Sequence, residues 1–417
     1  MPKKKRKSSN KPKRRKNNKR QIDEYKQKTN CSDLIDGTVE LSTFSDHIID
    51  DSGDEEVSEF SINSILQSDL LEQILVYLPI ASMVKAGLVC KKWREITTSK
   101  RFLLNASQTV PQKPWYFMHI DDYHYVQSWY AYDPILQKWQ RIEFLDMMES
   151  FRICDSSDGL VCYRKKNEIY VCNPITRETK KLPRLTYFGC SLFTNISVNQ
   201  RSHNYIVSVL TFQLVAGSRE ELSFHVYDSA TMSWSASQME VLRGWISGHK
   251  SVICNRVIYF LVRSRTIRTS RGPSQFGLLA YNFSSDSSSL GELLHSFIPL
   301  PCSNICGLIN LKGKLIIVAA IGRSGDEELN FGFSIWLLKG KDWQEISRIT
   351  HTCFGNSDEA FRCSGAGDLI YIRAHLRPQI VVFDMKLKQW KDFQKCPMGM
   401  GDFFNGFCLQ PRLDISP

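Results

Sequence analysis

Long apolar runs are absent from this chain of 417 residues. The longest, such as residues 315–321, fall far short of the roughly 20 residues that a helix needs to span a bilayer. No apolar secretory segment follows the first residues either. We therefore expect a soluble protein with no membrane partner.

Closely spaced cysteine pairs are also missing, although the chain has thirteen cysteines. They sit singly among strand-like residues, as at Cys162 and Cys172, and the nearest pair, Cys302 and Cys306, has no histidine close by in the sequence. A zinc site needs pairs of thiolates or histidines at short spacing. We expect reduced thiols, as in the cytosol or nucleus, and no metal or other cofactor.

Acidic residues are lacking in the first 20 residues, which contain twelve Lys and Arg. Subtracting these twelve charges from the net charge of +11 leaves −1 for the rest of the chain. The basic character therefore belongs to a tail and not to a folded surface, so nucleic acid is an unlikely partner.

The tail holds two basic clusters of the kind that act as nuclear-import signals. The residues are Lys3, Lys4, Lys5, Arg6 and Lys7, then Lys13, Arg14, Arg15 and Lys16. An acidic segment follows, since residues 29–84 contain no Lys or Arg. We expect residues 1–60 to be a disordered basic tail and acidic linker. We also expect a nuclear protein, with a cytoplasmic pool or a tail without any targeting role as the alternatives.

From Ser68 the apolar pattern becomes helical. Ser68 is a plausible N-cap, and Pro79 stops the first helix. The predicted apolar stripe consists of Leu70, Leu71, Ile74, Leu75 and Leu78; a second helix follows with Met83, Val84, Leu88 and Val89, and a third with Trp93 and Ile96. The unit spans only about 40 residues, near the lower limit for an independent core, so some of these side chains must face a partner.

After Thr109 the chain turns to short β-rich runs with a recurring pattern. A strand ends in an aromatic or apolar residue followed by Asp or Asn, often with Trp six residues later. The pattern recurs around positions 133, 173, 228, 282, 336 and 384. Such periods, with several strands each, are typical of propeller blades. We predict a mainly β fold with about six blades, in which residues 403–409 complete the first blade, Asp or Asn caps a turn, and Trp packs between blades.

Two stretches resemble known families. The first comprises Leu66-Gln67-Ser68-Asp69-Leu70-Leu71-Glu72-Gln73-Ile74-Leu75, Leu78-Pro79 and Leu88-Val89-Cys90-Lys91-Lys92-Trp93-Arg94 and closely resembles an F-box. The second comprises Asp158-Gly159-Leu160-Val161, Ile169-Tyr170-Val171-Cys172-Asn173-Pro174-Ile175-Thr176-Arg177 and Lys181-Leu182-Pro183 and is similar to the first blades of plant F-box/kelch-repeat proteins. We therefore place an F-box at 61–106 and a kelch-like β-propeller at 107–417.

The resemblance implies the substrate-recognition subunit of a Skp-cullin-F-box ubiquitin ligase. The F-box would bind a Skp-family adaptor, and through it a cullin-RING ligase, while the propeller holds the target protein for ubiquitination. No catalytic residue is implied. The implied adaptor contacts are Leu70, Leu71, Ile74, Leu75, Leu78, Pro79, Val89, Cys90 and Trp93. The family's usual Leu-Pro opening is Leu66-Gln67 here, which removes a rigid helix start.

Three alternatives remain open. A propeller can host an enzyme, but the nine histidines are scattered and form no spaced cluster. A nuclear scaffold or RNA-associated protein would use the basic tail without ligase assembly. In the third alternative, the helices only cap the propeller.

The target site is expected on one face of the propeller, where the connections between the central strands of each blade project. The connection is short at 164–167 and longer at 213–221, 263–275 and 322–330. We expect Arg265, Arg268 and Arg271 to bind an acidic or phosphorylated segment of the target. In the alternative, this loop only pairs with the acidic residues 326–328 in solvent.

Overall fold

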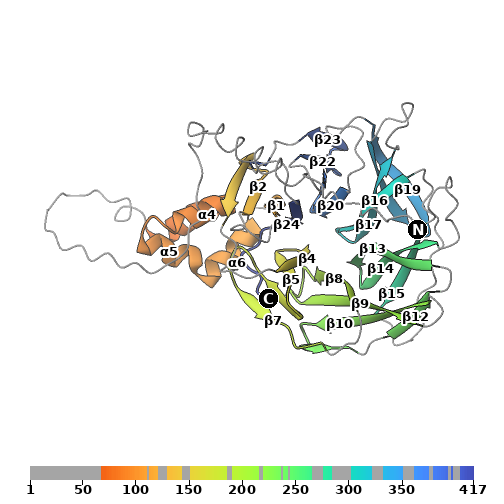
Figure 1. Ribbon diagram of the computed structural model, residues 1–417. Coiled ribbons are helices and arrows are strands. Elements are labelled where there is room, and N and C mark those ends of the chain that lie inside the picture. Colours follow the sequence, from red (N-terminus) through yellow and green to blue (C-terminus); the bar gives the residue numbers. More distant parts are fainter. Residues whose placement is uncertain are drawn as a thin grey trace, which may run out of the picture. The chain divides into compact units, whose positions relative to one another are not determined.

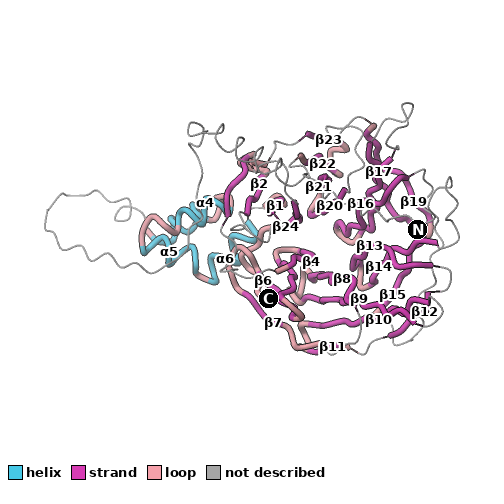
Figure 2. The backbone as a smooth tube through the Cα atoms, in the orientation of Figure 1, coloured by secondary structure: helices cyan, strands magenta, loops and turns pink. Residues whose placement is uncertain are grey.

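The computed structural model describes residues 67–417 apart from several short segments. The gaps are 110–111, 121–128, 143–150, 186–189, 216–218, 236–237, 243–244, 265–275, 284–301, 322–331, 351–360, 375–378, 393–395 and 398–403. Within the described part, helices precede Thr109 and strands follow it (Figures 1 and 2). The basic tail and acidic linker predicted at 1–60 lie outside the described residues.

Four short helices begin the described chain: α3 (Ser68–Leu75), α4 (Ile80–Ala86), α5 (Lys91–Thr98) and α6 (Lys100–Thr109). The N-cap of α3 is Gln67 and not Ser68, and it makes no side-chain capping hydrogen bond. The first helix ends at Leu75, four residues before Pro79, which was predicted to stop it. Pro79 is instead the N-cap of α4. Proline suits a helix start because its missing N–H has no helical partner there.

The sequence analysis did not predict α6 as a separate helix, yet α6 joins the helices to the β-structure. Its Phe102 is fully buried, and it shares one hydrophobic cluster with Leu71 and Leu75 of α3 and with Trp115 and Phe117 of the first strand. The i, i+4 spacing of Phe102 and Ala106 is a helical signal that the sequence did contain.

Antiparallel sheets form the rest of the fold, and each sheet is one blade. The first blade contains β1 (Trp115–Ile120), β2 (Trp129–Asp133) and β3 (Lys138–Ile142). The second contains β4 (Arg152–Ser157), β5 (Leu160–Lys165), β6 (Glu168–Cys172) and β7 (Thr179–Lys181). The third contains β8 (Cys190–Val198), β9 (Tyr205–Val215), β10 (Arg219–Asp228), β11 (Ser233–Trp234) and β12 (Gln238–Leu242). The fourth blade contains β13 (Trp245–Cys254), β14 (Val257–Ser264) and β15 (Phe276–Asn282). The fifth contains β16 (Cys302–Leu311), β17 (Lys314–Ile321), β18 (Gly332–Lys339) and β19 (Asp342–Ile349). The sixth contains β20 (Phe361–Ala366), β21 (Leu369–Ala374), β22 (Ile380–Asp384) and β23 (Gln389–Asp392).

The last strand, β24 (Phe404–Leu409), completes the first blade as predicted. It pairs antiparallel with β1, from Trp115 opposite Leu409 to Ile120 opposite Phe404. The six inner strands β24, β4, β8, β13, β16 and β20 contact one another in this order, and β20 contacts β24 again. The six blades therefore close a ring (Figure 1), which confirms the predicted propeller.

The predicted capping of the blade turns by Asp or Asn is confirmed in four blades. After β2, Asp133 Oδ1 accepts the backbone N–H groups of Ile135 at 2.8 Å and Leu136 at 3.2 Å. The same side-chain cap, with N–H donors two or three residues later, occurs at Asn173, Asp228 and Asp384. These short polar side chains stabilise a tight turn because they accept hydrogen bonds from backbone N–H groups within the turn.

The fifth blade corrects one detail of the predicted repeat. Its third strand, β18, runs past Trp336 and ends at Lys339. Gly340 follows with φ +63°, a conformation that glycine adopts without steric cost. The turn here thus depends on glycine in place of an Asp or Asn cap.

Tryptophans of the outer strands pack between blades, as the sequence predicted. Trp390 Nε1 donates to Ser347 Oγ of the preceding blade at 2.9 Å. Trp234 Nε1 donates to the carbonyl oxygen of Pro183 at 2.9 Å, in the segment that links the second and third blades. Each indole therefore adds a directed contact to its apolar packing.

Polar side chains of the inner strands also join neighbouring blades. Asp155 Oδ2 accepts the N–H of Ile196 at 3.0 Å, and Ser157 Oγ accepts that of Val198 at 3.1 Å. Burial raises the pKa of Asp155 to about 7, although hydrogen bonds from the backbone of Ile196 and Ser156 oppose this effect. The fold therefore favours the protonated carboxyl.

This shift predicts a pH-dependent stability. The ordinary pKa of the carboxyl is 3.8. The stability that the raised pKa contributes is therefore fully present below that pH and is lost as the pH rises through about 7. Asp155→Asn keeps the acceptor oxygen but does not ionise. We expect the melting temperature of this variant minus that of the unmodified chain to be larger at pH 8 than at pH 5. Thermal unfolding at both pH values tests this, and Asp342→Asn at an exposed position is the control. An equal shift at both pH values would contradict it.

The C-terminal segment after β24 forms a second latch on the ring. Asn173 Nδ2 donates to the carbonyl oxygens of Arg412 and Ile415, both at 2.9 Å. Ile415 is 1% exposed and lies in a cluster built from the second and third blades. At Gly159 (φ +93°) a Cβ atom would come within 2.8 Å of Arg412 Cβ, so the Asp-Gly turn is shaped to receive this segment.

Removing residues 412–417 should therefore destabilise the propeller. One buried Ile side chain and two hydrogen bonds together contribute about 3 kcal/mol. Denaturant unfolding followed by tryptophan fluorescence measures the change. Removing only residues 416–417 is the matched control, since it retains Ile415. Equal midpoints for the two truncations would show that the latch contributes nothing.

Candidate functional site

Exposed large hydrophobic side chains concentrate between residues 70 and 89 in the part of the chain that is described. Leu70, Ile74 and Tyr77 are 49%, 54% and 67% exposed, and their i, i+4, i+7 spacing places them on one side of α3 and its last turn. Leu88 and Val89, between α4 and α5, are 54% and 63% exposed. These five residues are called the apolar face below. Large apolar side chains that stay exposed within one short stretch of chain favour an interaction surface.

The predicted adaptor contacts divide into three groups by burial. Leu70, Ile74 and Val89 are exposed. Leu78, Pro79, Cys90 and Trp93 are half-buried. Leu71 and Leu75 are 1% exposed and pack in the same cluster as Phe102. The helical stripe predicted from the sequence is therefore two stripes, one turned inward and one outward.

Tyr77 was not singled out from the sequence. Leu88 was predicted with Val89 on the second helix but not among the adaptor contacts; that helix prediction is wrong for both residues, since α4 ends at Ala86. Tyr77 lies three residues after Ile74, a spacing that continues the exposed side of α3. Leu88 adjoins Val89 directly. Adaptor binding by any of these residues stays a prediction.

Gln112 connects the helices to the propeller's C-terminal end. The N–H of Ile80, the first residue of α4, donates to Gln112 Oε1 at 3.5 Å. The Gln410 side chain donates to the Gln112 carbonyl oxygen. On the helical side, Arg101 of α6 forms an ion pair with Glu72 of α3. The two hydrogen bonds of Gln112 add to the shared hydrophobic cluster that holds the helices against the first blade.

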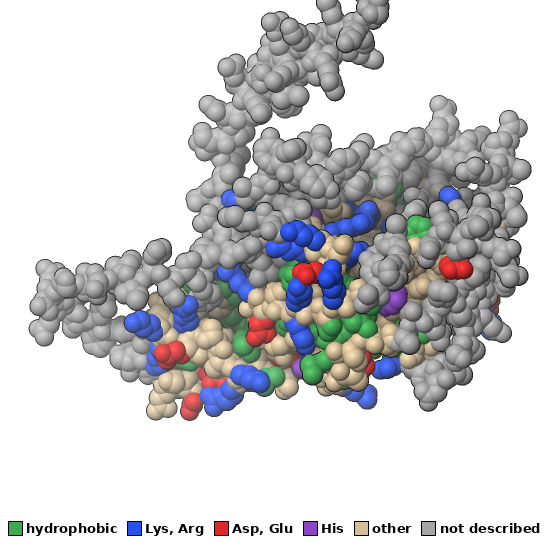
Figure 3. Space-filling view, turned by 60° about the horizontal axis from the view of Figure 1, so that its bottom comes forward, with side chains coloured by type: hydrophobic (Ala, Val, Ile, Leu, Met, Phe, Trp, Pro, Cys, Tyr) green, Lys and Arg blue, Asp and Glu red, His purple; other side chains and the backbone are tan. Residues whose placement is uncertain are grey.

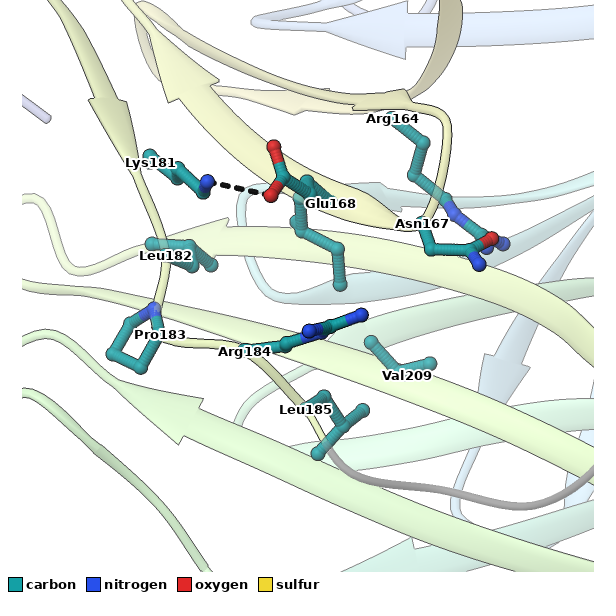
Figure 4. Close-up of a pocket in the computed structure, with 10 residues that line it drawn as sticks. Arg164, Asn167, Glu168, Lys181, Leu182, Pro183, Arg184, Leu185 and Val209 are labelled. Carbon is teal, nitrogen blue, oxygen red and sulfur yellow. Dashed lines mark hydrogen bonds and ion pairs between the residues drawn. The ribbon is translucent and has the colours of Figure 1, made fainter.

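A small hollow with room for about one water molecule opens between the second and third blades (Figure 4). We call it the blade 2–3 groove; it is lined by Arg164, Asn167, Glu168, Ile169, Lys181, Leu182, Pro183, Arg184, Leu185 and Val209. The apolar members belong to or pack against the cluster between the two blades, except for Pro183. Sequence reasoning did not single out this groove, because its residues come together only when two blades pack side by side.

One ion pair lies at the rim of this groove. Lys181 Nζ lies 2.5 Å from Glu168 Oε1, and the Tyr170 hydroxyl donates to Glu168 Oε2 at 2.7 Å. Lys181 first, and Tyr170 next, hold the pKa of Glu168 below its usual value. Glu168 thus neutralises Lys181 at the rim of the groove.

Two sets of predicted residues lie outside the described part of the chain. They are the import residues Lys3 to Lys7 and Lys13 to Lys16, and the proposed target contacts Arg265, Arg268 and Arg271. The connection expected at 213–221 is wrong as a long loop: β9 and β10 extend through it as a hairpin, with Val215 opposite Arg219.

Among the described residues, no group of three or more His, Cys, Asp or Glu side chains is placed to hold a metal ion. None of the described helices is long and apolar enough to cross a membrane.

The fold defines the class of protein: a closed six-bladed propeller preceded by a small helical module. Residues 64–105 match the F-box domain family, and residues 131–384 match the KIB1-4 beta-propeller family. The chain therefore belongs to the F-box proteins with a KIB1-4 β-propeller, and the resemblance to F-box/kelch-repeat proteins is confirmed.

Its relatives agree with this assignment. F-box/kelch-repeat protein At3g61590 of Arabidopsis thaliana is 42% identical over 386 residues, which cover 87% of this chain and 92% of that protein. F-box only protein 13 of the same plant is 23% identical and covers 86% of each chain. Protein UNUSUAL FLORAL ORGANS, also from Arabidopsis thaliana, is 24% identical over 84% of this chain and 85% of its own length.

Solved structures show only distant likeness. Apo AztD from Citrobacter koseri aligns with 71% of this chain and 98% of its own, with 12% identity and a TM-score of 0.37.

Proposed function

We propose that this chain is the substrate-recognition subunit of a Skp-cullin-F-box ubiquitin ligase. The F-box binds a Skp-family adaptor, and through it a cullin-RING ligase, while the propeller binds a protein target for ubiquitination. The observation that carries the proposal is the apolar face on an F-box whose own core is already filled. Membership in the F-box family and the relatives' names support it.

The division of labour within α3 supports adaptor binding. Leu71 and Leu75 are buried in the same hydrophobic cluster as Phe102 of α6, so the outward side chains Leu70 and Ile74 are held on a firm base. Burying a Leu or Ile side chain that is half exposed contributes on the order of 1 kcal/mol. Five such residues supply enough apolar surface for the centre of an interface.

In this proposal the chain has no catalytic role and needs no cofactor. Its contribution is to hold two partners on one folded body, while the transfer of ubiquitin belongs to the other subunits that the resemblance implies. The nine predicted adaptor contacts keep their places in this proposal: the exposed ones touch the adaptor and the buried Leu71 and Leu75 orient α3.

Replacing two residues of the apolar face tests adaptor binding. We expect Leu70→Asp with Ile74→Asp to weaken co-purification of a Skp-family adaptor by about 100-fold or more, because two carboxylates would be buried without partners. The helices should remain folded, since both positions are exposed. Leu71 is unsuited to this test because an Asp at this buried position would unfold the helices.

Leu387→Asp is the matched control, because Leu387 is as exposed as Ile74, at 54%, but lies in the sixth blade. It should leave adaptor binding unchanged. The proposal fails if the double variant retains the adaptor at the control's level, with circular dichroism showing intact helices.

We also propose that the basic tail directs the protein to the nucleus. Deleting residues 1–20 should move a fluorescent fusion from the nucleus to the cytoplasm without changing its melting temperature, because such a segment contributes little packing. Deleting residues 40–59, a segment of the same length that contains no Lys or Arg, is the control. Nuclear fluorescence that persists without residues 1–20 would refute the import role.

A further inference from the structure

We infer that Cys154 and Cys162 are a peroxide-reactive pair: a peroxide oxidises Cys154, and Cys162 then closes a reversible disulfide with it. This inference goes beyond the proposed function, because the reaction needs neither an adaptor nor a target. It assigns an oxidation site to the second blade of the propeller.

A bulge in the inner strand of the second blade brings the two cysteines together. Ile153 of β4 lies opposite Tyr163 of β5. Asp155 lies opposite Cys162, the neighbour of Tyr163, so Cys154 is the extra residue and two residues of β4 oppose Cys162. Opposed Cα atoms on antiparallel strands lie about 4.5–5.5 Å apart. A disulfide accepts about 4.4–6.8 Å, which leaves room for the displacement of a bulge residue.

The two thiols lie on the same face of the second blade. Cys162 belongs to the hydrophobic cluster between the second and third blades, together with Ile196. The other bulge residue, Asp155, is directed to that face as well, since its carboxyl accepts the N–H of Ile196. The Cys162 thiol donates a hydrogen bond to the Cys154 sulfur. The two sulfur atoms are therefore within hydrogen-bonding distance before any oxidation.

Cys154 has the environment of a reactive thiol. The hydrogen bond from Cys162 is the largest cause that holds the pKa of Cys154 below its usual value; the charges of Arg164 and Arg152 act in the same direction, and burial opposes them. The same hydrogen bond raises the pKa of Cys162. Because the thiolate is the form that attacks an oxidant, Cys154 reacts first and Cys162 second.

Access to solvent gives the same order. Cys154 is half-buried, whereas Cys162 is 0% exposed. Figure 3 views the molecule from the side of the second and third blades, whose outer surface carries Lys and Arg side chains beside apolar surface. Because Cys162 reaches no surface, an oxidant meets the pair at Cys154. A small uncharged peroxide suits a half-buried thiol, since oxidation depends on thiolate character and exposure together.

The reaction has two balanced steps. The Cys154 thiolate attacks one oxygen of the peroxide: the S–O bond of a sulfenic acid forms, the O–O bond breaks, and the departing hydroxide takes up a proton to become water. The Cys162 sulfur then attacks the Cys154 sulfur: the S–S bond forms, the S–O bond breaks, and the hydroxide leaves with the Cys162 proton as water. The two thiols are oxidised, and the peroxide is reduced to water. A thiol reductant reverses the disulfide by exchange.

The pair fits a sensor of peroxide better than a permanent bond. Structural disulfides belong to oxidising compartments, and those that form in the cytosol or nucleus are mostly transient. Here the disulfide would join β4 to β5 across the turn at Asp158. The inner strand β4 contacts the inner strands β24 and β8 of both neighbouring blades. Oxidation would therefore act at a position that the whole ring shares.

Peptide mapping of the folded full-length protein tests the inference. Trypsin cuts after Arg152 and Arg164, so residues 153–164 are released as one peptide whose only cysteines are Cys154 and Cys162. The protein is treated with about ten equivalents of hydrogen peroxide and then unfolded and alkylated. We expect the peptide to escape alkylation and to weigh two hydrogens less than its reduced form. Dithiothreitol should restore alkylation of both cysteines.

Two substitutions separate the roles of the thiols. Cys154→Ser should leave Cys162 open to alkylation after peroxide, because Cys162 is not the first to react. Cys162→Ser should leave Cys154 as a sulfenic acid, which dimedone traps. Since Cys162 is fully buried, circular dichroism must show that this second variant is folded. The result with Cys154→Ser does not depend on it.

Cys363 provides the matched control. It is the third residue of the inner strand β20, as Cys154 is of β4, and it is also half-buried. It lies opposite Ile372 in a regular register, and burial raises the pKa of its thiol to about 12. We expect Cys363 to be oxidised at least about tenfold more slowly than Cys154. Cys363→Ser should form the disulfide within residues 153–164 normally.

The inference is overturned by full alkylation of residues 153–164 after peroxide, by equal oxidation of Cys154 and Cys363, or by a disulfide between Cys154 and any cysteine other than Cys162. Adaptor co-purification, measured on the same protein, keeps this result separate from the proposed function. A protein that forms the disulfide but binds no adaptor would keep the oxidation site and lose the ligase role. Adaptor binding without the disulfide would do the reverse.

Discussion

The pairing of β24 with β1 is the constraint on which the rest of the structure depends. A single blade cannot bury both of its faces, so each is stable only between two neighbours. The pairing brings residues 404–409 beside residues 115–120. The first and last blades thereby become neighbours of each other. The entropy cost of closing so long a loop grows only slowly with its length, and the contacts of Asn173 with the C-terminal segment add to the closure.

Ring closure also divides the surface into two sides that carry different structural elements. Tight turns capped by Asp133, Asn173, Asp228 and Asp384 follow the third strand of their blades. The start of β1 and the end of β24 lie at these same strand ends, so the helices and the C-terminal segment share that side with the turns. The connections from second to third strands leave from the other side, where the chain is free to vary in length and charge.

Local features were predictable from the sequence, and features that depend on packing were not. An Asp or Asn cap needs only its own turn, so the blade repeat could be read from single positions; the fifth blade was misplaced because its turn uses Gly340 in place of such a cap. Two adjacent i, i+4 pairs, Leu70 with Ile74 and Leu71 with Leu75, look alike in sequence. Only packing into the hydrophobic cluster that includes Phe102 of α6 decides which pair is buried. The groove around Arg184 requires two blades and has no local signal.

The joint between helices and propeller has a consequence for the proposed receptor. The helices do not hang on a flexible linker: α3, α6, β1 and β2 contribute to one hydrophobic cluster, and Gln112 ties the start of α4 to the C-terminal segment. A flexible joint would let a bound target sample many distances from the adaptor. A continuous core restricts the target to a narrow range of positions, which raises the effective concentration of its lysines near the transferring subunit. In the proposed receptor, burial of Phe102 would therefore bear on the placement of the target as well as on stability.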